Sequence, residues 1–367
     1  MTRRVRAPFR GDHVGSLLRP KTLLDLRERA GRGEIDAATL RAHEDACIEA
    51  AVRMQEAVGL QGISDGEFRR ESFHGDFIDK LEGVEFKLFH PGGGKTGAAP
   101  FAAVVSDKIA RPAGGIEVDN FRFLAGLTSR TAKQTIPSPT MTHFRGGRQA
   151  ISETAYPDMA EFFADLARVY REEVQGLAEA GCRYLQLDDT NLAYLCDERM
   201  REGAAARGED VERLPHDYAA LINASIEGRP PEMSISVHLC RGNARSRWFA
   251  EGGYEPVAEV VFNELDVDGF FLEYDDERSG DFAPLRFVPP GKIVVLGLLT
   301  SKHGELEDPD LLKRRVEEAT QYIDLDQLCL SPQCGFASAA AGNLLTEDDQ
   351  RRKLELVVEL ANEIWGE

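Results

Sequence analysis

Residues 234–241 read Ser-Ile-Ser-Val-His-Leu-Cys-Arg, an apolar run that ends in His238, Leu239 and Cys240. The run predicts a strand, and strand side chains alternate between two faces with a period of two. His238 and Cys240 therefore point to the same side of the chain. Nitrogen and sulfur ligands suit a soft-to-borderline metal, with zinc as the first choice. Taken alone, the pair also fits a buried histidine and an inert cysteine that share a strand end by chance.

Two later strand ends supply further ligands for such a metal. Glu273 closes the apolar run 269–273, and Cys334 follows the apolar run 328–330. Successive members of the set His238, Cys240, Glu273 and Cys334 are 2, 33 and 61 positions apart, unlike the paired CxxC knuckles of a structural zinc site. Two thiolates and a carboxylate around Zn²⁺ make bound water a poor source of hydroxide. The set therefore predicts an open, catalytic zinc site that holds a substrate thiolate.

Short apolar runs alternate with helical patterns along the chain, as in a parallel sheet with crossover helices. Eight strands are predicted, with ends near residues 16, 65, 138, 187, 241, 273, 298 and 330. Residues 37–58, 158–180 and 347–365 are among the predicted helices. The prediction is an α/β fold of one domain, residues 1–367, folded as a (β/α)8 TIM barrel with its chemistry at the carboxyl ends of the strands. The alternative is an open doubly wound sheet, but no Gly-x-Gly-x-x-Gly turn follows the first strand.

Residues from about 87 to 130 interrupt this rhythm. They contain two glycine-rich turns, residues 91–94 and 112–115. We predict a hairpin inserted after the second strand, over one rim of the barrel. The glycine run 92–94 could be mistaken for a phosphate-binding loop, but it lacks the strand-to-helix context and the Lys-Ser/Thr ending that such a loop needs. It is interpreted as a flexible turn.

The composition, 42% hydrophobic and 29% charged, is that of a globular protein, without an apolar stretch of 18 residues. The first ten residues carry arginines but lack the apolar core of a secretory signal. Six cysteines are scattered through the chain, which favours a reducing, cytoplasmic compartment. The net charge of −19 argues against nucleic acid or an anionic membrane as the main partner. The oligomeric state is left open, with a homo-oligomer as one option.

Further polar residues stand at the predicted strand ends and are candidates for substrate binding or proton transfer. They are Ser16, Asp65, Glu67, Asp188, Asp189, Lys302 and His303. Some have a purely structural alternative. Asp189 could cap the next helix, and His303 could be a solvated side chain in a polar loop. Cys47, Cys182 and Cys329 are interpreted as core residues.

Six short motifs follow the predicted strands. They are His13-Val14-Gly15-Ser16, Asp65-Gly66-Glu67-Phe68, Leu185-Gln186-Leu187-Asp188, His238-Leu239-Cys240, Leu272-Glu273 and Ser331-Pro332-Gln333-Cys334-Gly335. In combination they resemble the catalytic barrel of cobalamin-independent methionine synthase over most of the chain. The resemblance implies a (β/α)8 barrel that binds zinc through His238, Cys240, Glu273 and Cys334. It also implies that the amino-acid substrate is held by His13, Gly15, Ser16, Glu67 and Asp188. Two carboxylates suit the α-ammonium of homocysteine.

The sequence also departs from that family. The full-length plant and bacterial enzymes carry a second, N-terminal barrel, whereas the length of this chain leads us to expect one. Their Asp-Ile-His-Ser segment after strand seven corresponds to residues 300–303, Thr-Ser-Lys-His, which makes His303 the candidate proton donor to the leaving group. Asp188 is followed by Asp189-Thr190 instead of Glu-Pro. Residues 135–144 are not close enough to the family's folate-contacting segment to assign contacts.

The resemblance predicts a zinc-dependent S-methyltransferase that moves a methyl group from 5-methyltetrahydrofolate, or another methyl donor, to homocysteine and gives methionine. Zinc would exchange Glu273 for the substrate sulfur and present a thiolate to the methyl carbon. One alternative is a zinc-dependent thiol alkyltransferase of the epoxyalkane:coenzyme M transferase type. Glu67 and Asp188 favour an ammonium-bearing thiol over the sulfonate of coenzyme M. A further hypothesis is a zinc-storage barrel that has lost catalysis.

Overall fold

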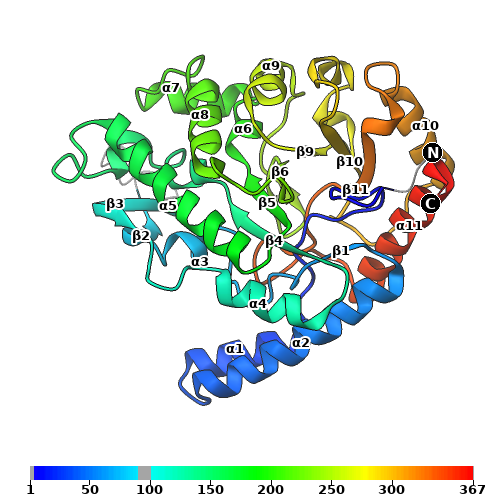
Figure 1. Cartoon of the computed structure of the whole chain (residues 1–367), viewed down its shortest axis with the longest axis horizontal. Coiled ribbons are helices and arrows are strands. Elements are labelled where there is room, and N and C mark those ends of the chain that lie inside the picture. Colours follow the sequence, from blue (N-terminus) through cyan, green and yellow to red (C-terminus); the bar gives the residue numbers. More distant parts are fainter. Residues whose placement is uncertain (1–3, 90–100, 367) are drawn as a thin grey trace.

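The computed structural model describes residues 4–89 and 101–366, and its centre is a curled sheet of parallel strands (Figure 1). The sheet has the order β1-β4-β5-β6-β9-β10-β11, so that neighbours in space also follow one another in sequence. Its strands are β1 (Gly62–Ile63), β4 (Thr131–Pro137), β5 (Tyr184–Asp189), β6 (Ser234–Leu239), β9 (Gly269–Glu273), β10 (Ile293–Leu299) and β11 (Leu328–Pro332). The last five are buried along their whole length, which explains their continuous apolar runs.

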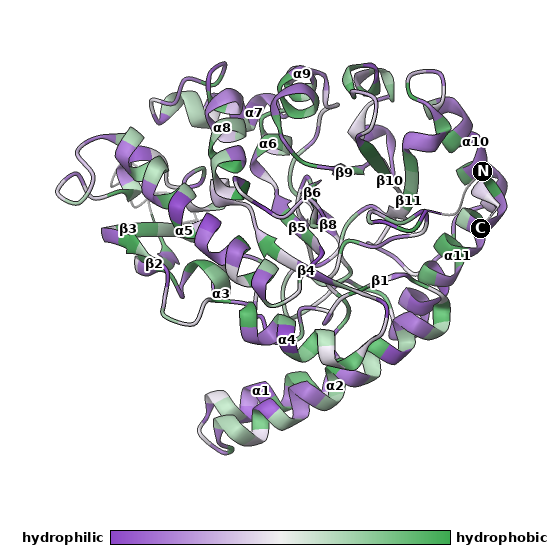
Figure 2. Ribbon diagram, viewed as in Figure 1, coloured by the Kyte–Doolittle hydropathy of each residue, from purple (hydrophilic) through white to green (hydrophobic). Residues whose placement is uncertain are grey.

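Helices connect the strands and surround the sheet (Figure 1). They are α1 (Lys21–Gly31), α2 (Ala37–Val58), α3 (Gly75–Ile78), α4 (Val118–Leu127), α5 (Met159–Glu179), α6 (Asn191–Tyr194), α7 (Glu198–Ala206), α8 (Leu214–Ile226), α9 (Glu255–Glu264), α10 (Pro309–Ala319) and α11 (Glu347–Trp365). Apolar and hydrophilic residues both occur on these helices, as expected of amphipathic helices that cover a core (Figure 2). Within residues 4–89 and 101–366, no helix has the length and apolarity needed to cross a membrane.

Local capping sets the ends of the helices that the sequence predicts best. The side chain of Asp36 accepts a hydrogen bond from the backbone N–H of Thr39 at the start of α2, and Gly59 ends that helix in the left-handed region, with φ +100°. Thr346 and Asp349 form a reciprocal capping box at the start of α11. The predicted helices at 37–58 and 347–365 are confirmed at these boundaries.

An irregular segment, rather than a regular eighth strand, lies between β11 and β1. The backbone N–H of Asp12 donates to the carbonyl of Leu330 at 2.9 Å, and Gly11 forms a parallel bridge with the same residue. On the other side, Nε2 of His13 lies 3.1 Å from the carbonyl oxygen of Gly62 in β1. The prediction of a (β/α)8 barrel is thus confirmed in its coarser form, as a curled parallel sheet of seven strands that is consistent with a TIM-like barrel.

The segment between β1 and β4, where an inserted hairpin is predicted, has other boundaries than expected. Strands β2 (Glu82–Leu88) and β3 (Phe101–Ala110) form an antiparallel pair, whereas residues 118–127 are the helix α4. The prediction of one hairpin over residues 87–130 is therefore wrong in its extent. Its glycine run, residues 92–94, lies outside the described residues. A second small antiparallel pair, β7 (Asn243–Ala244) with β8 (Arg247–Trp248), follows β6.

A fully buried polar cluster ties the irregular segment to the inside of the sheet. Nζ of Lys133 in β4 lies 3.3 Å from Oδ1 of Asp12, and the hydroxyl of Tyr184 in β5 donates to Oδ2 of Asp12 at 2.8 Å. Asp12 also accepts hydrogen bonds from the backbone N–H groups of Phe9 and His13. A buried carboxylate with this many partners fixes residues 9–13 against β4 and β5.

Removing one partner of this buried ion pair should destabilise the fold strongly. We expect Lys133→Met to lower the free energy of unfolding by about 3–5 kcal/mol, because it leaves the Asp12 carboxylate buried without a cation. Urea unfolding followed by circular dichroism would measure the change. Lys21→Met is the matched control, since Lys21 is 84% exposed and its substitution should cost less than about 0.5 kcal/mol. Equal stabilities of the two variants would contradict this account of the segment.

Candidate metal and substrate site

A cavity of about 500 Å³ opens at the carboxyl ends of the strands, where ligands of barrel folds bind. Its wall includes Asp188 of β5, His238 and Cys240 of the β6 end, and Cys334 after β11. These residues are almost fully buried, with Cys240 only 4% exposed, whereas Phe101 on the same wall is 49% exposed. The cavity therefore runs from a buried floor to an exposed mouth.

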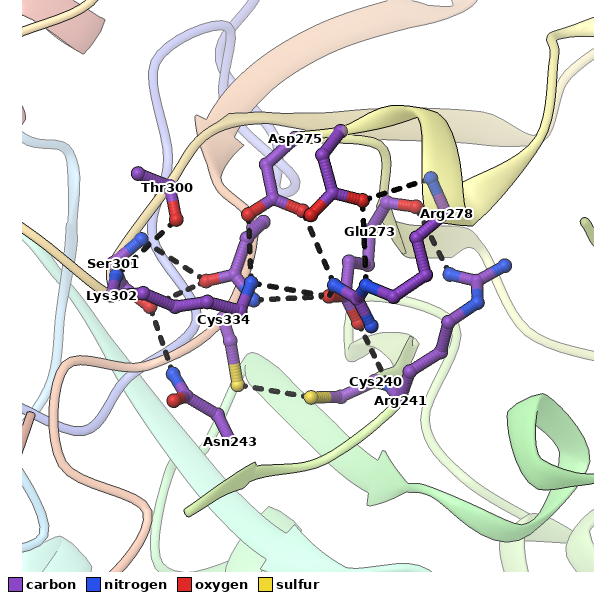
Figure 3. A network of polar contacts seen from close by, with 12 residues as sticks. Cys240, Arg241, Asn243, Glu273, Asp275, Arg278, Thr300, Ser301, Lys302 and Cys334 are labelled. Carbon is purple, nitrogen blue, oxygen red and sulfur yellow. Dashed lines mark hydrogen bonds and ion pairs between the residues drawn. The ribbon is translucent and has the colours of Figure 1, made fainter. Parts of the chain in front are cut away.

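Three of the four predicted metal ligands meet at the floor. Ligand atoms of His238, Cys240 and Cys334 all lie within 4.8 Å of one another, and the three residues are buried. The sulfur atoms of the two cysteines face each other 3.1 Å apart (Figure 3). Both ring nitrogens of His238 are buried without a hydrogen-bond partner in the described part of the chain. An imidazole with an unused nitrogen beside two thiols is a donor set that fits zinc.

The neighbouring Cys334 stabilises the protonated form of Cys240. The hydrogen bond with Cys334, together with burial, raises the pKa of Cys240 well above its ordinary value. A buried pair of thiolates would be strongly repulsive without a nearby positive charge. A divalent cation supplies that charge and deprotonates coordinating thiols. The arrangement could therefore hold a metal ion, which would replace the thiol protons.

Glu273 is adjacent to this group but not part of it. Its carboxylate contacts the backbone of Arg241 and the side chains of Arg278 and Lys302 (Figure 3). Burial opposes its ionisation, but Lys302, Arg241 and Arg278 outweigh burial and lower the pKa of Glu273 to about 2. Glu273 is thus a permanent carboxylate that is already bound by protein groups. As a metal ligand, it stays a prediction.

Three of the predicted substrate residues, Ser16, Glu67 and Asp188, lie on the cavity wall. His13 and Gly15 are not on that wall. Gly15 has φ +134°, and a Cβ at this position would come within 2.6 Å of Cγ2 of Thr135. Only glycine allows the backbone at position 15 to pass this close to Thr135. This path of the backbone places the next residue, Ser16, on the cavity wall. The structure gives Gly15 a backbone role beside the site.

Glu67 and Asp188 are neighbouring buried carboxyl groups on the cavity wall, and Oε1 of Glu67 also lies 3.6 Å from Nη1 of Arg70. Glu67 is a non-glycine residue with φ +59°, a conformation that is uncommon outside functional sites and tight turns. Its Oε1 accepts a hydrogen bond from the hydroxyl of Thr135 at 2.7 Å, while Oε2 is buried without a hydrogen-bond partner in the described residues. Burial, followed by repulsion from Glu67, raises the pKa of Asp188 to about 7. Two neighbouring buried carboxylates favour a cationic ligand.

The predicted proton donor His303 is not brought into the site. Its side chain is exposed, and it does not line the cavity. The preceding residue, Lys302, turns inward instead and places Nζ 2.7 Å from Oδ2 of Asp275. The position of His303 therefore gives no support to a role in proton transfer. Asp189 has the capping contact that the sequence offered as its alternative role: its carboxylate accepts a hydrogen bond from the backbone N–H of Leu192 at the start of α6.

The sequence reasoning missed another part of the cavity wall. This part combines aromatic, sulfur and cationic side chains: Phe73, His74, Phe101, Phe144, Arg145, Tyr194, Met200, Arg207 and Phe249. His74 is 5% exposed, and neither of its ring nitrogens has a hydrogen-bond partner in the described chain. These residues come from the segments that follow β1, β4, β5 and β6 along the chain. No spacing in the sequence signals that they share one wall.

The chain is similar to known proteins over most of its length. The family described as "Cobalamin-independent synthase, Catalytic domain" matches residues 11–363. The uncharacterized protein YxjH of Bacillus subtilis is 46% identical over 98% of this chain and 96% of its own length. The methionine synthase of Pyrococcus abyssi is 24% identical over 88% of this chain and 85% of its own.

A solved structure supports the same relationship. The putative vitamin-B12 independent methionine synthase of Listeria monocytogenes has a TM-score of 0.80 and 41% identity, and 99% of each chain is covered. The match to the family extends over nearly the whole chain and includes every residue of the cavity floor. The chain therefore belongs to the family of the cobalamin-independent synthase catalytic domain, a family of methionine synthase-like methyltransferases.

Proposed function

We propose that this protein is a zinc-dependent S-methyltransferase that transfers a methyl group from 5-methyltetrahydrofolate, or another methyl donor, to homocysteine and forms methionine. The observation that carries the proposal is the meeting of His238, Cys240 and Cys334 in a cavity that also holds Glu67 and Asp188. The first three residues are a donor set for zinc, and the two carboxylates suit an ammonium group. A thiol that bears an amino group combines both requirements.

The residues of the floor would orient homocysteine. Asp188 and Glu67 would bind its α-ammonium, and Ser16 would donate its hydroxyl to the carboxylate. Zinc held by His238, Cys240 and Cys334 would lower the pKa of the substrate thiol and keep it as a thiolate.

Methyl transfer needs little further covalent chemistry from the protein. An electron pair of sulfur, freed by loss of the thiol proton, forms the new bond to carbon. The bond between the methyl group and the donor breaks, its electrons stay with the donor, and the donor atom takes up a proton in place of the methyl group. The protein would supply alignment of sulfur, carbon and leaving group, which is a large part of the rate in such reactions. The exposed aromatic mouth would enclose the donor and exclude water from the reacting atoms.

Loss of either sulfur ligand should remove the metal and the activity together. We expect Cys240→Ser and Cys334→Ser to bind zinc poorly and to lower kcat/KM for homocysteine by at least about 100-fold. Zinc per chain is measured by atomic emission, and methionine is measured by mass spectrometry. Cys47→Ser on α2 is the matched control and should keep both zinc and activity. Full activity after removal of zinc with a chelator would rule out the proposal.

The carboxylate of Asp188 should matter only for a thiol that carries an ammonium group. We expect Asp188→Asn to raise the KM for homocysteine at least about tenfold, because a charge-assisted hydrogen bond is lost. For 4-mercaptobutyrate, which lacks the amino group, the KM of the same variant should equal that of the wild type. If coenzyme M replaced homocysteine as the preferred thiol, the assignment of Asp188 would be wrong and the alkyltransferase alternative would be favoured.

The raised pKa of Asp188 also predicts a dependence on pH. Because this pKa is about 7, the carboxylate is ionised above pH 7 and becomes protonated as the pH falls below it. The KM for homocysteine should therefore rise as the pH is lowered from about 8 to about 6. Steady-state kinetics over this range, with Asp188→Asn as the comparison, would check the prediction. A variant that keeps the full pH dependence would show that another group causes it.

A further inference from the structure

Two arginines, Arg145 and Arg207, lie on the wall of the cavity, where both are half-buried. Arg145 donates a hydrogen bond to the carbonyl oxygen of Phe101 at 3.3 Å. Arg207 donates to the carbonyl oxygens of Gly203 and Phe144, each at 3.0 Å, and Phe144 is the residue directly before Arg145. Neither guanidinium forms an ion pair in the part of the chain that the structure describes. The two wall arginines therefore keep their positive charge available to a ligand of the cavity.

The lack of an acidic partner stands out in a chain with a net charge of −19. Arg70, for comparison, lies 3.6 Å from a carboxylate oxygen of Glu67. Glu209 is close to Arg207 in the sequence, but its carboxylate lies 3.7 Å from Nε2 of His143 instead. Burial outweighs the attraction of Glu209 and lowers the pKa of Arg207 below its ordinary value. A shielded cation of this kind favours a ligand that brings a negative charge.

His74 adds a hydrogen-bonding group to the wall. Its side chain is 5% exposed, and neither ring nitrogen has a hydrogen-bond partner among the described residues. The ring packs against Phe73 and Phe86, with centroids 4.3 and 4.8 Å apart. Burial, followed by the positive charge of Arg145, lowers the pKa of His74 well below its ordinary value. The ring is therefore neutral at pH 7 and has one N–H to donate to a ligand.

These three residues come from distant segments of the sequence and are linked through the aromatic residues of the wall. His74 precedes α3, Arg145 follows β4, and Arg207 follows α7 (Figure 1). Phe86 packs against His74 and stacks on Phe101, with 5.6 Å between the centroids of the two phenylalanine rings. The carbonyl oxygen of Phe101 in turn accepts the hydrogen bond from Arg145. An aromatic surface thus connects the imidazole to the guanidinium groups.

Arginine and aromatic side chains together suit a planar anion. The guanidinium binds carboxylate or phosphate oxygens through two parallel hydrogen bonds and stacks on aromatic faces. The rings of Phe101 and Phe249 are 49% and 55% exposed and can pack against a ring of the ligand. At about 500 Å³, the cavity has the size of sites for drug-sized ligands, so that homocysteine leaves room for a second molecule. A sulfonium or quaternary ammonium donor would meet the two wall arginines with like charge.

We infer that His74, Arg145 and Arg207 form a subsite, separate from the candidate metal ligands, for an anionic group carried by an aromatic methyl donor. The inference rests on the proposed function and deepens it, since it names the class of the donor as an aromatic anion instead of a sulfonium or quaternary ammonium cation. All three residues lie outside the six motifs by which the chain resembles its family. The subsite is therefore a property of the wall and not of those motifs.

Affinity for a simple aromatic anion tests the inference without a methyl donor. Isothermal titration calorimetry with saturating homocysteine compares 2-naphthoate with 2-naphthamide, a neutral probe of similar shape. We expect the wild type to bind 2-naphthoate at least about tenfold more tightly, because a charge-assisted hydrogen bond is added. In Arg145→Gln the two affinities should lie within about threefold of each other. Arg314→Gln on α10 is the matched control, since it removes an exposed arginine away from the cavity and should keep the preference. Equal affinities of the wild type for the two probes would overturn the inference.

Two further probes define the charge that the subsite accepts. Tighter binding of 2-naphthyl phosphate than of 2-naphthoate would assign the subsite to a phosphate, and the reverse order would assign it to a carboxylate. Both results support an anion-binding subsite. Tighter binding of 2-naphthyltrimethylammonium than of either anion would overturn the inference.

His74→Phe provides a second test if Arg145→Gln does not fold. The new ring keeps the aromatic packing, and the nitrogens that it removes have no hydrogen-bond partner among the described residues. The urea midpoint of unfolding should therefore be unchanged, whereas the affinity for 2-naphthoate should fall at least about threefold through loss of a hydrogen bond. Unchanged affinity for 2-naphthoate in the folded variant would overturn the inference.

Homocysteine binding separates this inference from the proposed function. It is followed by the sulfur-to-metal charge-transfer absorption of the Co²⁺-substituted protein, and Arg145→Gln should bind homocysteine as the wild type does. A loss of homocysteine affinity as large as the loss for 2-naphthoate would assign Arg145 to the carboxylate of the amino acid and overturn the inference. A wild type that prefers 2-naphthoate but binds no zinc would overturn the proposed function and leave the anion-binding subsite valid.

Discussion

Parallel pairing of β5, β6 and β9 is the constraint on which the site depends. The register places Asp188 directly beside His238, and His238 beside Phe271, two residues before Glu273. A slip of one residue in β6 would turn His238 to the opposite face and separate it from Cys334. Because the strands are buried along their whole length, such a slip would also move the polar side chains of the strand ends away from their buried partners.

Electrostatic interactions at the site are strong because they are buried. Lys302, Arg241 and Arg278 lower the pKa of Glu273 to about 2. Burial, by contrast, raises the pKa of Asp188 to about 7. The two carboxylates therefore have different properties a short distance apart in the fold. One is a permanent anion used by the protein, and the other is an anion that a cationic substrate would stabilise. The different environments would allow a site with several acidic groups to hold both a metal and an amino acid, as the proposed function requires.

The sequence predicted the strand ends well, because each is an apolar run followed by polar residues. His238, Cys240, Cys334, Glu67 and Asp188 were all found in this way, and the cavity contains all five. The contacts of Glu273 could not be predicted, since its partners Arg278 and Lys302 lie on later loops whose course is set by tertiary packing. The same applies to the exposed position of His303, which the motif alone could not distinguish from that of Lys302. The helix α4 was missed because glycine-rich turns precede it.

The gradient of exposure along the cavity gives its two parts different chemistry. At the floor, Cys240 and His238 are 4% and 3% exposed, whereas Phe101 and Phe249 at the mouth are 49% and 55% exposed. A molecule that covers these rings shields the floor from water, which lowers the local dielectric and strengthens every charge interaction below it. A thiolate that would be heavily solvated in water then keeps its electron pair available for the methyl carbon. Under the proposed function, the apolar mouth and the charged floor would depend on each other. The rings alone would bind a donor without activating a thiol, and a metal alone would leave its thiolate hydrated.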